Sequence, residues 1–212
     1  ARLSDPRARV IGHDPPYGAD FNFYLAQAGP ATITVSGADG TIINTVHVRG
    51  IKGLNRAWWD LRYPNGSMPH MLVPPPDAPW VPNGPAGYHI LTGIMIPGTV
   101  TGPRVTPGSY TVKLDAGGAI ESQPLHVLAD PASLGTAATM QAQLEFKQGI
   151  EREIDTVSHM IEHLEWVRKQ LANVEMRYRG DASHRDVVAE SRRLADQAIA
   201  VEGKLIDVHL TE

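Results

Sequence analysis

The chain has 212 residues, of which 42% are hydrophobic, and its formal net charge is -4. This size allows one large or two small packed domains, and the slight acidity gives no electrostatic basis for nucleic-acid binding. The absence of cysteine excludes a disulfide framework and a thiolate metal site, and no apolar run approaches the roughly 20 residues of a membrane-spanning helix.

Up to Asp130 the chain alternates apolar and polar residues, as half-buried strands do. The segments DFNFYLAQ and ATITVSG are followed by Asp39-Gly40, a favourable hairpin turn because glycine tolerates positive φ. The segments TIINTVHV, SYTVKLDAGG and AIESQPLHVL show the same strand character. Together with the segment GLNRAWWDLRYP they predict six or seven short strands and a β-sandwich over residues 18–130, after an N-terminal extension of residues 1–17.

Two adjacent tryptophans stand in the segment GLNRAWWDLRYP, and neighbouring strand residues point to opposite faces. Trp59 is predicted to enter the core, on the face that also carries Ala57 and Leu61. Trp58 shares the other face with Arg56 and Arg62, either of which can lie over its ring in a contact of about 0.5–1 kcal/mol. Trp58 then either packs under the following insertion, the favoured interpretation, or contacts a partner.

Residues 64–106 form a proline-rich insertion that interrupts the strand pattern, because proline cannot donate to a sheet ladder. Within it, YHILTGIMIP is compatible with one short strand. The insertion has too little apolar alternation for a core of its own, yet it carries many apolar residues, among them Trp80. We expect it to be ordered only if it lies on the sandwich or on a neighbour, and an exposed apolar surface there to mark an interface.

Residues 131–212 change to a period of about 3.6, which predicts an antiparallel hairpin of helices at 138–179 and 183–209. Gly180 suits the end of the first helix, and Ser183 with Asp186 resembles a capping box for the second. The predicted seam contains Ile150, Ile154, Val157, Ile161, Leu164 and Leu171 on the first helix, and Val187, Ser191, Leu194, Ala198, Val201, Leu205 and Val208 on the second.

The first helix also carries His159-x-x-Glu162-His163, the inverted zincin pattern. On a helix the two histidines share a face and could bind one zinc ion, with Glu162 polarising its water. However, they lie nearly opposite the apolar stripe, where no cleft or third ligand is expected. A solvated face is therefore favoured over a metalloprotease or adventitious metal binding. Trp166 projects near these histidines and is available for a contact.

Three groups of residues resemble a known module: DPPYGADFNFYLAQAGPATITVSGADGTII, GLNRAWWDLRYP and TPGSYTVKLDAGG with SQPLHVLADP. They resemble the C-terminal region of bacterial sortilin-like (BNR-repeat, glycosyl hydrolase-like) β-propeller proteins, in which a FlgD-type immunoglobulin-like domain precedes a helical segment. The resemblance covers roughly residues 13–63 and 106–175. It implies an immunoglobulin-like sandwich and an extracytoplasmic, periplasmic or secreted, location.

The propeller itself is absent, since its Ser-x-Asp-x-Gly-x-x-Trp signature does not occur and SGADGT has the wrong spacing. We therefore expect a non-catalytic structural or protein-interaction module, a stabilising or scaffolding subunit of a larger extracytoplasmic or membrane-associated assembly. The alternative is an accessory domain of a sortilin-like hydrolase. No catalytic residue, cofactor or metal is predicted. Partners are expected to be protein subunits, with peripheral contact to a membrane complex possible, through Arg56, Trp58, Arg62, Trp80, His159, His163 and Trp166.

Overall fold

The computed structural model describes residues 16–89 and 101–207. They form two compact units. The first contains the described residues up to Pro64 together with Arg104–Met140, and the second contains Asn65–Pro103 and the residues from Gln141 onward. The proline-rich insertion therefore belongs to the same unit as the helices.

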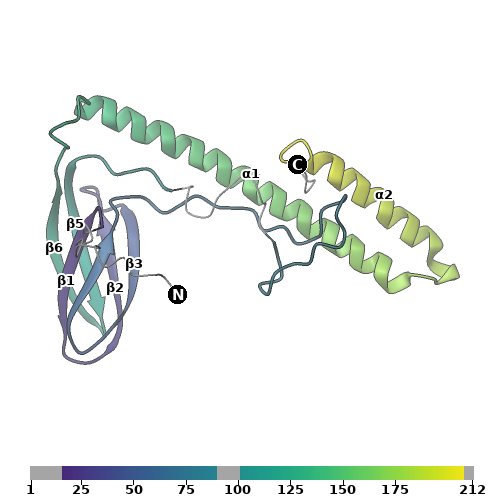
Figure 1. The fold of residues 1–212 in the computed structure, drawn as a ribbon, viewed down its shortest axis with the longest axis horizontal. Helices are drawn as coiled ribbons and strands as arrows, with labels where there is room; N and C mark the ends of the chain where they lie inside the picture. Colours follow the sequence, from purple (N-terminus) through teal and green to yellow (C-terminus); the bar gives the residue numbers. More distant parts are fainter. Residues whose placement is uncertain (1–15, 90–100, 208–212) are drawn as a thin grey trace, which may run out of the picture. The chain divides into compact units, whose positions relative to one another are not determined.

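The first unit is a β-sandwich of two antiparallel sheets, as the alternation predicted (Figure 1). One sheet pairs β1 with β4, and the other has the order β3-β2-β5-β6. The six strands coincide with the six predicted segments: β1 (Ala19–Leu25), β2 (Gly29–Ser36), β3 (Ile42–Gly50), β4 (Gly53–Trp59), β5 (Gly108–Ala116) and β6 (Ala119–Val127).

The core of the sandwich is built from alternate residues of both sheets. Phe23 and Leu25 of β1 pack with Ile33 of β2 and Ala57 of β4, while the residues between them point outward. The β2–β3 hairpin turns where Gly40 has a φ of +81°, as its sequence predicted. In that turn Asp39 accepts the backbone N–H of Thr41 at 3.0 Å.

Trp59 is buried in this core, with 2% of its surface exposed, which confirms the prediction for this residue. Its indole N–H donates to the carbonyl of Arg62 at 2.9 Å, and its ring meets Tyr110 edge-on. Trp58 is half-buried and donates to the carbonyl of Tyr17 at 3.2 Å, a contact within the first unit. The chain passes so close here that a Cβ on Gly18 would stand 2.1 Å from the Trp59 carbonyl oxygen.

Two long helices, α1 (Ala137–Tyr178) and α2 (Arg185–Glu202), are joined by a short 3₁₀ turn at Ala182–His184, and from Gln141 onward they belong to the second unit. The helices run antiparallel, because Glu175 pairs with Arg192 near the turn and Arg168 pairs with Glu202 farther from it. α2 lies alongside the C-terminal half of α1 (Figure 1).

The helix ends differ in detail from the prediction. Gly180 takes the expected positive φ of +84°. Asp181, not Ser183, provides the cap at the turn, since its carboxylate accepts the Ser183 N–H at 2.9 Å. α2 ends at Glu202, well before residue 209, and the backbone then turns so that the N–H of Leu205 donates to the Glu202 carbonyl.

The seam between the helices agrees with the predicted stripes at Ile161, Ser191 and Ala198, and it departs from them at the charged residues. The buried residues of α1 are Leu144, Ser158, Ile161, Glu165 and Arg168, and the last four step by three and four. On α2 they are Ser191, Ala198 and Glu202, whereas Leu194 and Val201 are 39% and 48% exposed. The apolar pattern thus located the helices correctly but did not identify the charged residues that occupy their contact.

The described part of the insertion packs with α1, as Figure 1 shows, rather than forming a separate core. Met71 is 3% and Ala78 2% exposed, and Met71 exchanges two backbone hydrogen bonds of 3.0 Å with His89. The segment YHILTGIMIP, predicted as a possible strand, lies mostly outside the described residues, and only this bridge at His89 is seen.

Candidate functional site

Polar side chains along one face of α1 bind the backbone of the insertion. Asp155 accepts the N–H of Ser67 at 2.6 Å, and Ser158 donates its hydroxyl to the Ser67 carbonyl at 3.1 Å. One turn further along, Glu162 accepts the N–H of His70 at 3.3 Å and lies 2.8 Å from its ring Nδ1. Residues three and four apart on a helix share a face, so these side chains form a continuous polar ladder.

The ladder continues into a buried charge cluster. Glu165 accepts the N–H groups of Leu72 and Val73 with one carboxylate oxygen. Its other oxygen accepts from Arg168 at 2.6 Å, and the same guanidinium nitrogen donates to Glu202 of α2 at 2.6 Å. Glu165 and Glu202 have no exposed surface, and Arg168 is 7% exposed. One cluster therefore ties the insertion, α1 and α2 together.

Two carboxylates share one guanidinium in this cluster, which leaves an excess of negative charge. Within the described residues, Oε1 of Glu202 is buried without a hydrogen-bond partner. Burial raises the pKa of Glu202 to about 7; Arg168 opposes this rise and the nearby carboxylate of Glu165 adds to it. Glu202 is also the last residue of α2, where the helix dipole disfavours a negative charge. Its neutral form is therefore accessible near neutral pH.

His89 faces the same cluster from the insertion. Burial lowers the pKa of His89, Glu165 acts in the opposite direction, and Arg168 lowers it further. The His89 ring nitrogen Nδ1 lies 3.0 Å from the Asn83 amide oxygen, and Asn83 in turn donates to the Leu72 carbonyl at 2.8 Å. The insertion is thus held by an internal polar network that ends at the buried charges.

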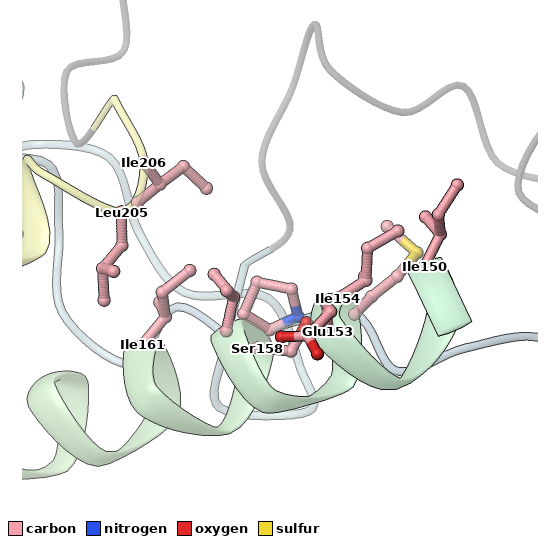
Figure 2. Close-up of a pocket in the computed structure, with 10 residues that line it drawn as sticks. Ile150, Glu153, Ile154, Ser158, Ile161, Leu205 and Ile206 are labelled. Carbon is pink, nitrogen blue, oxygen red and sulfur yellow. The ribbon is translucent and has the colours of Figure 1, made fainter. Parts of the chain in front are cut away.

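An apolar groove of about 350 Å³ opens beside this seam, in the second unit. Its floor is the α1 stripe, and Leu205 and Ile206, which follow α2, stand across from it (Figure 2). Two of the floor residues, Ile150 and Ile154, are 45% and 37% exposed. The lining consists of Met68, Pro69, Ile150, Glu153, Ile154, Val157, Ser158, Ile161, Leu205 and Ile206.

The two predicted contact tryptophans of the second unit are both exposed. Trp80 in the insertion is 76% exposed, and Trp166 on α1 is 54% exposed. The ammonium group of Lys169 lies 5.3 Å from the centre of the Trp166 ring. Neither tryptophan lines the groove.

The His159-x-x-Glu162-His163 pattern is assembled differently from a zinc site. His159 lies 3.8 Å from Glu162, but the other oxygen of Glu162 binds His70 of the insertion. His163 is exposed. Across residues 16–89 and 101–207, no three His, Cys, Asp or Glu side chains are grouped as they would be to hold a metal ion.

The remaining predicted contact residues belong to the first unit. Arg56 turns to the opposite strand, where it donates to Asn22 at 2.9 Å and lies 3.5 Å from Asp20. Arg62 lies 3.9 Å from Asp60. With the contact of Trp58 to the N-terminal side of β1, these side chains form a polar strand surface rather than a cavity.

Sequence reasoning missed the groove and the polar ladder, although both have a signal in the sequence. The apolar stripe of the first helix begins at Ile150, and the second helix is shorter, so part of the stripe has no helical partner among the described residues. Asp155, Glu162 and Glu165 follow the helical period one position away from that stripe. The proline-rich backbone that they bind gives no such periodic signal.

Within the residues that the structure describes, no helix is both long and apolar enough to cross a membrane. Comparison with known proteins found no matching family model, no matching curated protein and no matching solved structure.

Proposed function

We propose that this chain is a non-catalytic protein-interaction module, a stabilising or scaffolding subunit of a larger assembly. Its docking site is the apolar groove on α1, and its ligand there is an amphipathic helix of another protein. The observation that carries this proposal is the exposure of Ile150 and Ile154 at the floor of a groove with a second wall, Leu205 and Ile206.

The groove continues an interface that already exists in the molecule. α1 has 42 residues and α2 has 18, so α2 covers only part of the α1 face. Where α2 ends, the α1 stripe goes on through Val157, Ile154 and Ile150. Helices bind partners by placing an apolar face of residues three and four apart into such a hydrophobic groove. A partner helix would therefore extend the packing that α2 begins.

The acidic side chains Glu162 and Glu165 of α1 make structural contacts with the insertion. Glu162 binds the insertion backbone, and Glu165 is committed to two backbone N–H groups and Arg168. The ladder and cluster hold Met68 and Pro69, the groove wall contributed by the insertion, through Ser67 and His70 on either side. The arrangement supports a preformed binding surface.

For the first unit we propose an immunoglobulin-like topology, supported by its two antiparallel sheets and by the resemblance of its strands to the FlgD-type domain. The extracytoplasmic location rests on that resemblance alone. In this proposal the sandwich is a second attachment point, and its strand face with Arg56, Trp58 and Arg62 is the surface available for it.

The test of the docking site is a binding titration with a synthetic helical peptide. The peptide carries leucine at positions i, i+3, i+4 and i+7 and glutamine elsewhere, so that it presents an apolar stripe without charge. We expect saturable binding to the full chain, and at least a roughly tenfold weaker affinity for Ile154→Asp, because a carboxylate on the groove floor must be desolvated by the partner.

Met176→Asp is the matched control, since Met176 is on the same helix, is 66% exposed and does not line the groove. It should bind the peptide as the unmodified chain does. Equal affinities of Ile154→Asp and the unmodified chain, at equal stability in thermal unfolding, would place the binding elsewhere and end the proposal. Absence of any binding would also end it.

A further inference from the structure

We propose that the helix bound in this groove is basic: its apolar stripe enters the groove and lysine or arginine side chains flank the stripe. This inference rests on the proposed function and specifies the partner that the site selects.

The stretch of α1 that forms the groove floor is acidic. Residues 150–162 contain four acids and one base, giving a formal charge of 1 − 4 = −3 with histidine neutral. The acids are Glu151, Glu153, Asp155 and Glu162, and the base is Arg152. Two of these acids, Asp155 and Glu162, bind backbone N–H groups of the insertion. Those hydrogen bonds satisfy the oxygens but leave the net charge in place.

Glu153 is the one charged residue among those that line the groove in the described part of the chain. It is exposed, and none of the salt bridges within residues 16–89 and 101–207 involves it or Glu151. Burial raises the pKa of Glu151, and the like charge of Asp155 raises it further. A cationic side chain brought to this rim would meet carboxylates that lack a counter-charge.

A second copy of this chain is a poor occupant for the same reason. Two α1 helices that paired antiparallel through Ile150 and Ile154 would bring Glu151 and Glu153 of one copy next to the same residues of the other. Like charges placed together across an interface oppose association. The floor from Ile150 to Ile161 is about 18 Å long at 1.5 Å per residue, which suits about three turns of a foreign helix.

The experiment compares three peptides of one pattern, with leucine on the apolar stripe and either lysine, glutamine or glutamate at every flanking position. Affinities for the full chain are measured by fluorescence anisotropy at low and at high salt. We expect the affinity to fall in the order lysine peptide, glutamine peptide, glutamate peptide. At low salt the lysine peptide should bind about tenfold or more tightly than the glutamate peptide. Salt should shrink this ratio, because exposed charges are screened.

The charge-reversal variant is Glu153→Lys, which should weaken the lysine peptide by about threefold or more and strengthen the glutamate peptide. Asp196→Lys is the control: it makes the same change of net charge at an exposed position of α2 that does not line the groove. It should leave the peptide order unchanged. An equal response of both variants would show that net charge, not the groove rim, sets the preference, and would refute the inference.

The outcomes separate this inference from the proposed function. If the three peptides bind equally and Ile154→Asp weakens all of them, the groove is a docking site without charge preference and only the inference fails. If no peptide binds, both fail. Self-association that is abolished by Ile154→Asp and blocks the peptides would assign the groove to a second copy. Peptide binding that requires removal of residues 208–212 would assign it to the chain's own end. Either result overturns the basic partner.

Discussion

Glu202 is a buried carboxyl group with one oxygen on Arg168 and, within the described residues, no partner for the other. Its folded-state pKa of about 7 exceeds the ordinary 4.5, so the folded chain binds more protons between these values. The stabilisation from its protonated form is complete below about pH 4.5 and is lost as the pH rises through about 7. The difference between the folded and the ordinary pKa of Glu202 corresponds to about 3 kcal/mol in the free energy of unfolding.

Replacing Glu202 by glutamine should therefore raise the free energy of unfolding at pH 8 and have little effect at pH 5. The glutamine amide resembles the protonated carboxyl group, and its N–H can donate a hydrogen bond toward Glu165. His89 has a lowered pKa and works in the opposite direction, since protonating it in the unfolded chain favours unfolding below pH 6.5. Because both chains contain His89, its contribution cancels when the free energies of unfolding of Glu202→Gln and the unmodified chain are subtracted. Urea unfolding across the pH range measures the free energy of unfolding of both chains. If the difference between Glu202→Gln and the unmodified chain does not grow with pH, Glu202 is ionised throughout that range.

Single residues also show what the sequence could and could not predict. Trp59 was assigned to the core because alternation along a strand is strict, and the burial of Trp59 and Ala57 confirms it. The contact of Trp58 was not predictable in the same way. Its indole N–H donates to the carbonyl of Tyr17. Every residue has a backbone carbonyl, so the sequence does not indicate which one the indole will bind.

At the scale of elements, the insertion and α1 depend on one another. The proline-rich backbone forms hydrogen bonds within the insertion, and α1 adds the carboxylates of Asp155, Glu162 and Glu165 as further acceptors. Hydrophobic periodicity cannot predict such a ladder, because it identifies apolar faces and gives no signal for acidic residues that become buried. The partial offset of the helix seam has the same cause, because Glu165, Arg168 and Glu202 are buried although they stand outside the predicted apolar stripes.

Glu165→Ala should lower the free energy of unfolding by about 3–5 kcal/mol. The substitution removes one of the two buried carboxylates that face Arg168, and it leaves the N–H groups of Leu72 and Val73 without their acceptor. Glu162→Ala, on the same helix and also bonded to the insertion, is half-exposed and should cost about 1 kcal/mol or less. Chemical unfolding gives both values, and amide exchange at Leu72 and Val73 reports on the insertion directly. Equal costs for the two variants would mean that the buried cluster contributes nothing beyond an exposed contact.

At the scale of the molecule, the first unit is interrupted by the insertion yet closes on itself. The N–H of Val105 donates to the Leu61 carbonyl at 2.9 Å, and Arg62 and Arg104 form a β-bridge. The two ends of the interruption, Pro64 and Arg104, therefore lie near each other. The sequence predicted the sandwich and the helices, but it did not predict that the intervening segment belongs to the unit of the helices.

We expect the first unit to fold alone when residues 1–64 are joined to 104–140 by a short glycine-serine link, since its core clusters contain only residues of this unit. The shortened chain should unfold in one cooperative transition with the spectrum of a β-protein, and Trp59 should give a buried tryptophan emission. A chain with no cooperative transition would show that the sandwich requires the second unit.

We propose that the groove on α1 is a binding site for a helix. The most direct measurement is methyl NMR of the full chain with labelled isoleucine, titrated with the leucine–glutamine peptide. We expect saturable shifts of the Ile150, Ile154, Ile161 and Ile206 methyl groups, while Ile33 in the sandwich core and Ile120 on β6 remain unchanged. Shifts confined to isoleucines outside the groove, or no shifts at saturating peptide, would contradict it.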